Sequence, residues 1–218
     1  MPPCYTCHVT RNLAPAWARP FSEGWALVAP LALAATLTLR FPPLGLACAS
    51  AAGLVALALR DPERAILATD DVLAPADGRV VAIELVEDEW VGEALEISIF
   101  LALWNVHVQR APLAGRLMSV RHVSGGFAPA LYGQAATNNR QILDFDGDRG
   151  RFGVSLISGL IARRIVRWVE PGDKVAAGER IGMIKFGSRV TLRLPRSARP
   201  LVAPGMDVRA GITSVASF

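Results

Sequence analysis

Residues 170–178 have the sequence Glu-Pro-Gly-Asp-Lys-Val-Ala-Ala-Gly, and residues 203–211 repeat its plan as Ala-Pro-Gly-Met-Asp-Val-Arg-Ala-Gly. Proline presets the backbone angle at the first position of a turn, and glycine accepts angles that strain other residues. Each stretch therefore predicts a turn, a hydrophobic residue, and a second glycine before another strand. Residues 72–80, Val-Leu-Ala-Pro-Ala-Asp-Gly-Arg-Val, follow a similar plan. This repetition predicts a compact, partly repeated β core.

The chain that surrounds these stretches also favours β structure, because short apolar segments alternate there with glycine and proline. Val72–Pro75 and Arg79–Val86 are expected to form a hairpin, since Asp77-Gly78 supplies the backbone angles of a tight turn. Ala94–Leu103 is expected to be a buried strand that leads to His107 at its end.

Residues 124–139 are rich in glycine, alanine and polar residues without a clear period, and we expect a loop over the site there. The repeated stretches resemble the hairpins of the barrel-sandwich hybrid fold of lipoyl and biotinyl domains. The predicted fold class is mainly β (α+β), with a compact barrel-sandwich-hybrid-like core.

The N-terminal region differs in composition. Hydrophobic residues make up 52% of the chain, and two runs, Trp25–Leu39 and Phe41–Leu59, carry no charge. As helices they would extend about 22 and 28 Å, slightly short of a bilayer core of about 30 Å. Helices that are apolar on every face need a bilayer or a larger protein around them than 218 residues provide. We therefore predict a membrane-associated helical hairpin.

The predicted organisation is a flexible leader at 1–20, the hairpin at 21–64 and a β-rich catalytic domain at 65–218. Basic residues lie at both outer ends of the hairpin, which places both ends on the cytoplasmic face of the cell membrane. The net charge of +4 also favours anionic lipid head groups. Nucleic acid is not an expected partner, because 19 acidic residues disperse the charge and the sequence has no basic helix or RNA-binding motif.

The three cysteines are too few for a disulfide framework. Cys4-Tyr5-Thr6-Cys7-His8 matches the C-x-x-C-H pattern of covalent haem attachment. Such attachment occurs on the outer side of a membrane, opposite to the orientation predicted above, and a zinc ion would lack a fourth ligand. We expect no metal, and a loose leader is the plainer interpretation.

Gly187-Ser188 carries the functional hypothesis. A glycine–serine pair is usually a turn, but a serine that follows a residue without a Cβ is also able to attack its own peptide bond. Asp77 and His107 supply the acid and the imidazole that a nucleophilic site requires. Each has a plainer interpretation as well, because aspartate before glycine favours a tight turn and many histidines are structural.

Five motifs occur in the order in which they appear in the short form of the phosphatidylserine decarboxylase family, a family of pyruvoyl enzymes that this chain resembles. They are Glu23-Gly24-Trp25, Arg60-Asp61-Pro62-Glu63-Arg64, Ala76-Asp77-Gly78, Asn105-Val106-His107-Val108 and Phe186-Gly187-Ser188. The resemblance implies that Ser188 attacks the carbonyl of Gly187, and that β-elimination of the ester divides the chain between 187 and 188. A large and a small subunit would remain together, the small one beginning with a pyruvoyl group made from Ser188.

The resemblance also implies the remaining roles. The pyruvoyl ketone would withdraw electrons while the carboxylate of phosphatidylserine leaves as carbon dioxide, which yields phosphatidylethanolamine. His107, oriented by Asp77, would be the base of self-cleavage and plausibly the acid that protonates the product. Long-form relatives carry a second histidine three residues later, where this chain has Arg110. Either His107 serves both steps, or His122 supplies one of them.

Arg110 and Arg140 are candidates for binding the lipid phosphate or the serine carboxylate, since a guanidinium binds either group through two hydrogen bonds. Asn138-Asn139-Arg140 resembles an Asn-Glu-Arg element of the family, with Asn139 in place of the acid. Archaetidylserine has the same head group as phosphatidylserine and fits equally well.

Two alternatives from other classes stay open. One is a lipoyl-like or biotinyl-like carrier, in which Lys185 would be the modified side chain. The other is a membrane scaffold. A carrier gains mass as one chain, a scaffold stays one unmodified chain, and a decarboxylase divides in two.

Overall fold

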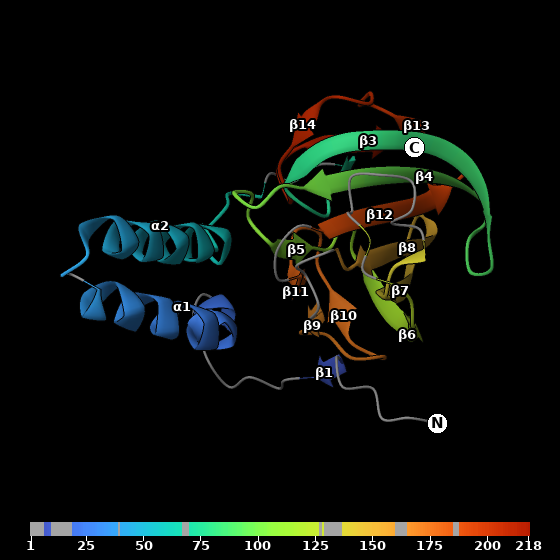
Figure 1. Cartoon of the computed structure of the whole chain (residues 1–218). Helices are drawn as coiled ribbons and strands as arrows, with labels where there is room; N and C mark the ends of the chain where they lie inside the picture. The colour runs from blue at the N-terminus through green and yellow to red at the C-terminus, as the bar shows by residue number, and fades with distance from the viewer. Residues whose placement is uncertain are drawn as a thin grey trace.

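The computed structural model describes residues 7–9, 19–38, 40–66, 70–126, 128, 137–159, 165–184 and 188–218. It shows a helical hairpin beside a β-rich part (Figure 1). The helices are α1 (Arg19–Leu37) and α2 (Pro42–Ala58). The strands are β1 (Cys7–Val9), β2 (Val72–Leu73), β3 (Gly78–Asp88), β4 (Gly92–Leu101), β5 (Val108–Arg110), β6 (Gly115–Val123), β7 (Arg140–Gly147), β8 (Gly150–Ile157), β9 (Ile165–Arg167), β10 (Lys174–Val175), β11 (Arg180–Ile184), β12 (Ser188–Pro195), β13 (Arg199–Pro200), β14 (Asp207–Val208) and β15 (Ser214–Ser217). The mainly β prediction is confirmed.

An eight-stranded sheet forms the centre of the β-rich part. Its strand order is β10-β6-β7-β8-β12-β4-β3-β14, all neighbours run antiparallel, and the sheet is visibly curled in Figure 1. Its two outermost strands, β10 and β14, come from the repeated stretches at 170–178 and 203–211. The turns before them contain Gly172 and Gly205, both with positive φ, as predicted from the proline–glycine pairs. The barrel-sandwich-hybrid likeness itself stays a prediction.

The hydrophobic core lies on one face of this sheet, here called the inner face. Val190 and Leu192 of β12 pair directly with Ile99 and Ile97 of β4, and all four side chains are fully buried in the core. Since side chains alternate along a strand, Ser188 belongs to the inner face and Arg189 to the opposite, outer face.

The expected hairpin of Val72–Pro75 with Arg79–Val86 is wrong. β2 pairs with β15 in a separate three-stranded sheet of order β13-β15-β2, whereas β3 pairs with β4 and β14. The reason lies in Gly78, where a Cβ would come within 2.0 Å of the carbonyl oxygen of Phe100. Gly78 therefore permits close contact of β3 with β4 and is not the tip of a tight turn.

A four-stranded sheet of order β1-β9-β11-β5 connects the core to the helices. Ile165 and Ile184 face the main core, while Val108 and Met183 on the other face pack with Leu59, next to the end of α2. The hairpin thus rests on this sheet by its base.

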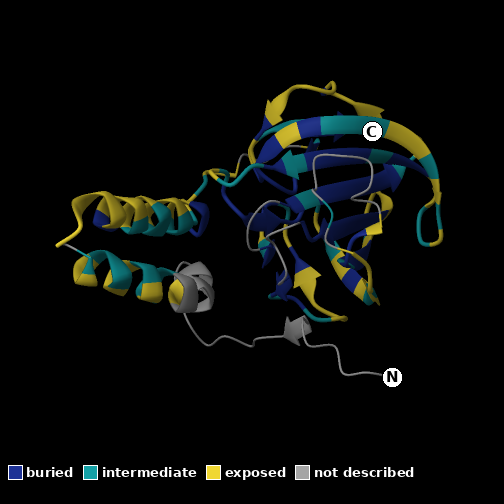
Figure 2. Ribbon diagram, in the orientation of Figure 1, coloured by how far each residue is buried: buried dark blue, intermediate teal, exposed yellow. Residues whose placement is uncertain are grey.

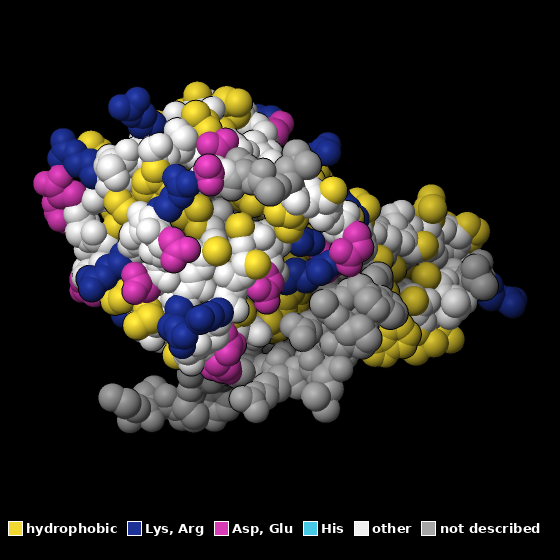
Figure 3. Space-filling view, turned by 180° about the vertical axis from the view of Figure 1, so that it is seen from behind, with side chains coloured by type: hydrophobic (Ala, Val, Ile, Leu, Met, Phe, Trp, Pro, Cys, Tyr) yellow, Lys and Arg dark blue, Asp and Glu magenta, His cyan; other side chains and the backbone are white. Residues whose placement is uncertain are grey.

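The two predicted helices are present and lie side by side, with Pro42 and Pro43 at the start of α2, where proline is favoured. Their outer surfaces leave apolar side chains exposed (Figure 2), including Leu37 and Leu46. Seen from behind, most charged side chains lie on the β-rich part and few on the hairpin (Figure 3). Among the described residues, neither helix has the length and hydropathy needed to cross a membrane, so the predicted membrane hairpin is not supported as a spanning unit.

The predicted flexible leader is described only in part. Residues 7–9 form β1, which pairs in parallel with β9 and does not match the predicted loose segment. Cys4 lies outside the described residues.

Candidate active site

Ser188 is the first residue of β12 and pairs with Leu101, the last residue of β4. It is 0% exposed, and its Oγ has no hydrogen-bond partner among the residues that the structure describes. A buried hydroxyl without a partner costs about 1–3 kcal/mol, so the position calls for a chemical explanation. Gly187 and Lys185 fall between the end of β11 and Ser188, outside the described residues.

His107 lies at the same end of β4, beyond a tight turn. Asn105 closes this turn, because its Oδ1 accepts a hydrogen bond from the backbone N–H of Ala102 at 2.8 Å. The carbonyl oxygen of His107 accepts the backbone N–H of Ile184 at 3.3 Å. Ile184 is the last residue of β11, shortly before Ser188, so the fold brings the predicted histidine and serine to one end of the sheet.

The backbone of His107 is also joined to the hairpin, since its N–H donates to the carbonyl oxygen of Ala58, the last residue of α2, at 3.3 Å. The final carbonyls of a helix lack partners within the helix. His107 satisfies one of them. The position of the histidine therefore depends on the base of the helical hairpin.

The imidazole of His107 is 1% exposed, and its Nδ1 lies 2.8 Å from the carbonyl oxygen of Asn105. A carbonyl only accepts hydrogen bonds, so Nδ1 carries the hydrogen and Nε2 carries the basic lone pair. Burial lowers the pKa of His107 from 6.5 to about 4, although the contact with Asn105 opposes the shift. At neutral pH the ring is uncharged, which is the form that a general base requires.

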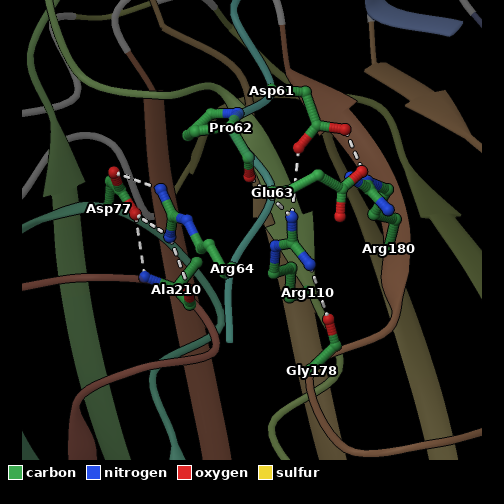
Figure 4. A network of polar contacts seen from close by, with 9 residues as sticks. All are labelled: Asp61, Pro62, Glu63, Arg64, Asp77, Arg110, Gly178, Arg180 and Ala210. Atoms are coloured by element: carbon green, nitrogen blue, oxygen red, sulfur yellow. Dashed lines mark hydrogen bonds and ion pairs between the residues drawn. The ribbon is translucent and has the colours of Figure 1, made fainter. Parts of the chain in front are cut away.

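Asp77 is held by a different partner from the one predicted. Its two carboxylate oxygens accept hydrogen bonds from Arg64 at 2.6 and 2.8 Å, and Oδ1 also accepts the backbone N–H of Ala210 at 2.8 Å (Figure 4). The predicted orientation of His107 by Asp77 is thus provided at Nδ1 by the carbonyl of Asn105. Asp77 acts on the imidazole through its charge, which raises the pKa of His107.

Arg110 is part of an internal ion cluster. Its guanidinium donates to Asp61 at 3.1 Å and to the carbonyl oxygen of Gly178 at 3.0 Å, and its side chain is 4% exposed. Asp61 also accepts a hydrogen bond from Arg180, as Figure 4 shows. These contacts bind the segment 60–64 to the β-rich part. The structure does not support the predicted role of Arg110 in substrate binding, because its donors are directed to internal partners.

His122 and Arg140 lie apart from Ser188. His122 is an exposed residue of β6, which β7 and β8 separate from β12. Arg140 pairs with Ile157, which in turn pairs with Arg189, so Arg140 belongs to the outer face while Ser188 belongs to the inner face. There it lines a small cavity of about 210 Å³ with Arg189 and other polar residues. Neither residue joins the predicted serine and histidine.

The loop predicted at 124–139 is described only at its two ends. The side chain of Asn138 joins them, because its Oδ1 accepts the N–H of Ala128 at 2.8 Å and its Nδ2 donates to the carbonyl oxygen of Ser158 at 2.8 Å. Residues 127 and 129–136, which would cover the site, lie outside the described residues.

Three contributions to the site escaped the sequence analysis. Arg64 belongs to one of the five motifs, but the sequence predicts no role for it, and the carbonyl of Asn105 carries no sequence signal. Gln109 lies two residues after His107, and its Nε2 donates to the carbonyl oxygen of His107 at 2.8 Å. The motif Asn105-Val106-His107-Val108 could have indicated that Asn105 matters, but not that its backbone carbonyl contacts His107.

A cavity of about 780 Å³ opens beside these residues. It is lined by Asp77, by Asn105 and Val106, by residues of the segment 60–64, and by the turn around Arg209. Within the described part of the chain, no three or more His, Cys, Asp or Glu side chains are grouped so that they could hold a metal ion. Asn105 and Val106 place this cavity next to His107 in the sequence, although the buried imidazole itself does not line it.

Comparison with known proteins agrees with this geometry. The family model described as phosphatidylserine decarboxylase matches residues 52–216. A phosphatidylserine decarboxylase proenzyme of Streptomyces coelicolor is 42% identical over 195 residues, which cover 87% of each chain. A putative archaetidylserine decarboxylase proenzyme of Methanopyrus kandleri is 41% identical over 216 residues, covering 93% of this chain and 97% of the relative. A phosphatidylserine decarboxylase proenzyme of Desulfotalea psychrophila is 43% identical over 161 residues, covering 71% of this chain and 74% of the relative.

Proposed function

The chain belongs to the phosphatidylserine decarboxylase family, and from this premise we propose how it converts phosphatidylserine to phosphatidylethanolamine. It is made as a proenzyme that cleaves itself between Gly187 and Ser188. The new N-terminus at position 188 then bears a pyruvoyl group.

The observation that carries the proposal is the buried Oγ of Ser188 without a hydrogen-bond partner, at the end of β4 that leads to a neutral histidine. The site fits the expected prosthetic group, because Oγ leaves with the new carboxylate of Gly187 during cleavage, and the buried hydroxyl without a partner is thereby removed. The pyruvoyl ketone, once formed, supplies the electron-withdrawing group that decarboxylation requires.

His107 supplies the proton transfers. In the proenzyme its Nε2 takes the proton from Oγ of Ser188 as the oxygen attacks the carbonyl carbon of Gly187. The resulting ester is broken by β-elimination: Cα of residue 188 loses its proton and Oγ leaves in the new carboxylate of Gly187, so that the small chain begins with a dehydroalanine. Water then replaces the nitrogen of this dehydroalanine, which leaves as ammonia, and the ketone of the pyruvoyl group is formed. In the mature enzyme the same nitrogen delivers a proton to the substrate carbon from which carbon dioxide has left. Because the carbonyl oxygen of Asn105 holds Nδ1–H, Nε2 is the nitrogen that takes up the proton in the first step and that carries it in the second.

The two products of cleavage stay together as a heterodimer of a large and a small subunit. The small subunit, residues 188–218, begins with β12, which lies between β4 and β8 in the middle of the main sheet. Removing it would expose both neighbouring strands and the core between them.

The hairpin attaches the enzyme to the cytoplasmic face of the cell membrane, where its substrate resides. Support comes from the apolar side chains exposed along it, including Trp25 at 69% and Leu37 at 74% exposure. Exposed apolar surface of this kind favours insertion at the level of the lipid head groups, with basic residues beside it.

Intact mass tests the proposal. Wild-type protein folded in lipid is expected to give two chains divided at 187/188 and to release carbon dioxide from phosphatidylserine, whereas Ser188→Ala should give one chain and no activity. Ser155→Ala is the matched control, because Ser155 is another buried serine of the same sheet, and this variant should divide normally. A single unmodified wild-type chain without activity would refute the proposal. A single chain with added mass at Lys185 would identify a carrier.

A further inference from the structure

The cavity beside His107 has an unequal balance of charge. Four arginines line it, namely Arg60, Arg64, Arg79 and Arg209. Two of them are neutralised, since Arg64 pairs with Asp77 and Arg79 pairs with Asp207. The remaining acid of the lining, Glu63, pairs with Arg180 outside the cavity at 2.9 Å.

Arg60 and Arg209 therefore remain without a carboxylate partner among the described residues. Arg60 donates only to carbonyl oxygens, those of Leu57 and Trp104, which fix the guanidinium without cancelling its charge. Arg209 is exposed, and its hydrogen bonds to the described residues all involve its backbone: its N–H donates to Oγ1 of Thr213 at 3.0 Å, and its carbonyl oxygen accepts the N–H groups of Ile212 and Thr213. Two unpaired guanidinium groups in one cavity attract an anion.

The anion would bind close to the reacting group. Asn105 and Val106 line the cavity and directly precede His107. The charge of Arg60 is near enough to lower the pKa of His107. An anion held at Arg60 would thus lie in the cavity that these two neighbours of His107 line.

Part of the rim of the cavity is apolar. Trp104 is 63% exposed and Ile212 is 47% exposed, and both side chains line the opening. Arg60 ties the Trp104 backbone to the last turn of α2, so this rim lies next to the base of the hairpin. Tryptophan favours the boundary between water and lipid, where an apolar ring and a polar N–H are both accommodated.

We propose that Arg60 and Arg209 bind the phosphodiester of the lipid substrate, and that the glycerol and acyl portion leaves the cavity over Trp104 and Ile212. This inference rests on the proposed function and assigns its substrate site. It replaces Arg110 and Arg140, whose guanidinium groups lie elsewhere. The phosphodiester is the shared chemistry of a lipid head group and of a free phosphate ester.

Arg209→Gln is the principal test, because the side chain is exposed and its loss leaves the fold intact. The variant should divide at 187/188 like the wild type, with kcat nearly unchanged and KM for phosphatidylserine raised about tenfold, the loss typical of one charged hydrogen bond. Arg199→Gln is the matched control, an exposed arginine of β13 outside the cavity, and its KM should equal that of the wild type.

Competition and binding give a second measurement that does not depend on turnover. Ser188→Ala protein should bind soluble glycerophosphoserine, and adding Arg209→Gln or Arg60→Gln should weaken this binding. Tighter binding of glycerophosphoserine than of inorganic phosphate assigns the site to the head group, and equal binding assigns it to phosphate in general. A KM for Arg209→Gln within twofold of Arg199→Gln, in a preparation whose wild type divides and releases carbon dioxide, overturns the inference while leaving the proposed function intact.

Trp104→Gln tests the exit path. Its decarboxylation of phosphatidylserine in vesicles should fall, while its binding of glycerophosphoserine should stay unchanged. Equal losses with both ligands would show that Trp104 shapes the cavity and does not contact lipid.

Discussion

Two arginine–aspartate pairs line the same cavity and differ in almost everything except composition. Arg64 and Asp77 are 2.6 Å apart with side chains 6% and 10% exposed, whereas Arg79 and Asp207 are 3.1 Å apart and 61% and 75% exposed. Only Gly78 separates Asp77 from Arg79 along the chain. Exposure to water, and not the pairing itself, therefore decides how much an ion pair contributes to the free energy of unfolding.

The buried pair is also saturated. Asp77 accepts a third hydrogen bond from the backbone of Ala210, and Arg64 donates to the carbonyl oxygen of the same residue. These contacts join the segment 60–64 to the C-terminal turn at Ala210, and they fix the part of the cavity that Arg64 and Asp77 line. Water and dissolved ions screen the exposed pair, which leaves the rim adaptable.

Removing the buried arginine should have the largest effect. Arg64→Met leaves the charge of Asp77 buried without its partner, and the free energy of unfolding should fall by about 3–5 kcal/mol. Urea unfolding measures this best in the Ser188→Ala background, where one chain unfolds. The double variant Arg64→Met, Asp77→Leu should recover much of the loss. A loss below about 1 kcal/mol would place this pair in the same class as the exposed one.

Acid should weaken the protein through His107 by a somewhat smaller amount. Its pKa is lowered to about 4 in the folded protein from 6.5, so the unfolded chain binds a proton first as the pH falls. The stability present above pH 6.5 is therefore lost progressively down to pH 4, by about 3 kcal/mol. Unfolding of Ser188→Ala and of Ser188→Ala, His107→Leu across this range isolates the effect. Parallel pH profiles for the two proteins would rule it out.

The turn before His107 should respond more weakly. Asn105→Ala removes the acceptor of the Ala102 N–H and should cost about 1 kcal/mol of unfolding free energy. The contact to Nδ1 of His107 comes from the backbone carbonyl and persists, so self-cleavage should continue. Loss of cleavage in a folded Asn105→Ala variant, measured by intact mass, would show that the side chain positions the imidazole.

The exposed pair should matter least. Arg79→Met is expected to change the unfolding free energy by about 0–1 kcal/mol, and less in high salt. Urea unfolding of Arg79→Met and of Arg64→Met, both in the Ser188→Ala background, compares the two pairs directly. A cost above about 2 kcal/mol would mean that the cavity excludes water more strongly than its exposed rim indicates.

The sequence predicted those elements that nearby residues determine, namely turns and the short strands beside them. The proline–glycine stretches at 170–178 and 203–211 gave turns and short strands, and the apolar run before His107 gave β4. The tight turn predicted at Asp77-Gly78 was wrong because a distant contact determines this glycine. Gly78 lies against the carbonyl oxygen of Phe100 on a neighbouring strand, where a side chain would not fit. A turn signal contains no information about such a distant contact.

The site was predicted by residue type and not by orientation. Ser188 and His107 both lie near the end of β4 at Leu101, but their direct contact stays a prediction. Arg110 and Arg140 have the right chemistry for phosphate, but strand register turns one toward Asp61 and the other toward the outer face. The partner of Asp77 could not be derived either, since Arg64 reaches it only after the segment 60–64 has docked.

The central position of β12 in the main sheet affects how the protein refolds before and after cleavage. Its eight residues are all in register with β4. If the chain divides between 187 and 188 as proposed, two chains hold the same sheet together afterwards, and renaturation from denaturant becomes a second-order process that slows on dilution. The mature enzyme should therefore recover from unfolding far less readily than its precursor, and its persistence is governed by how slowly it opens.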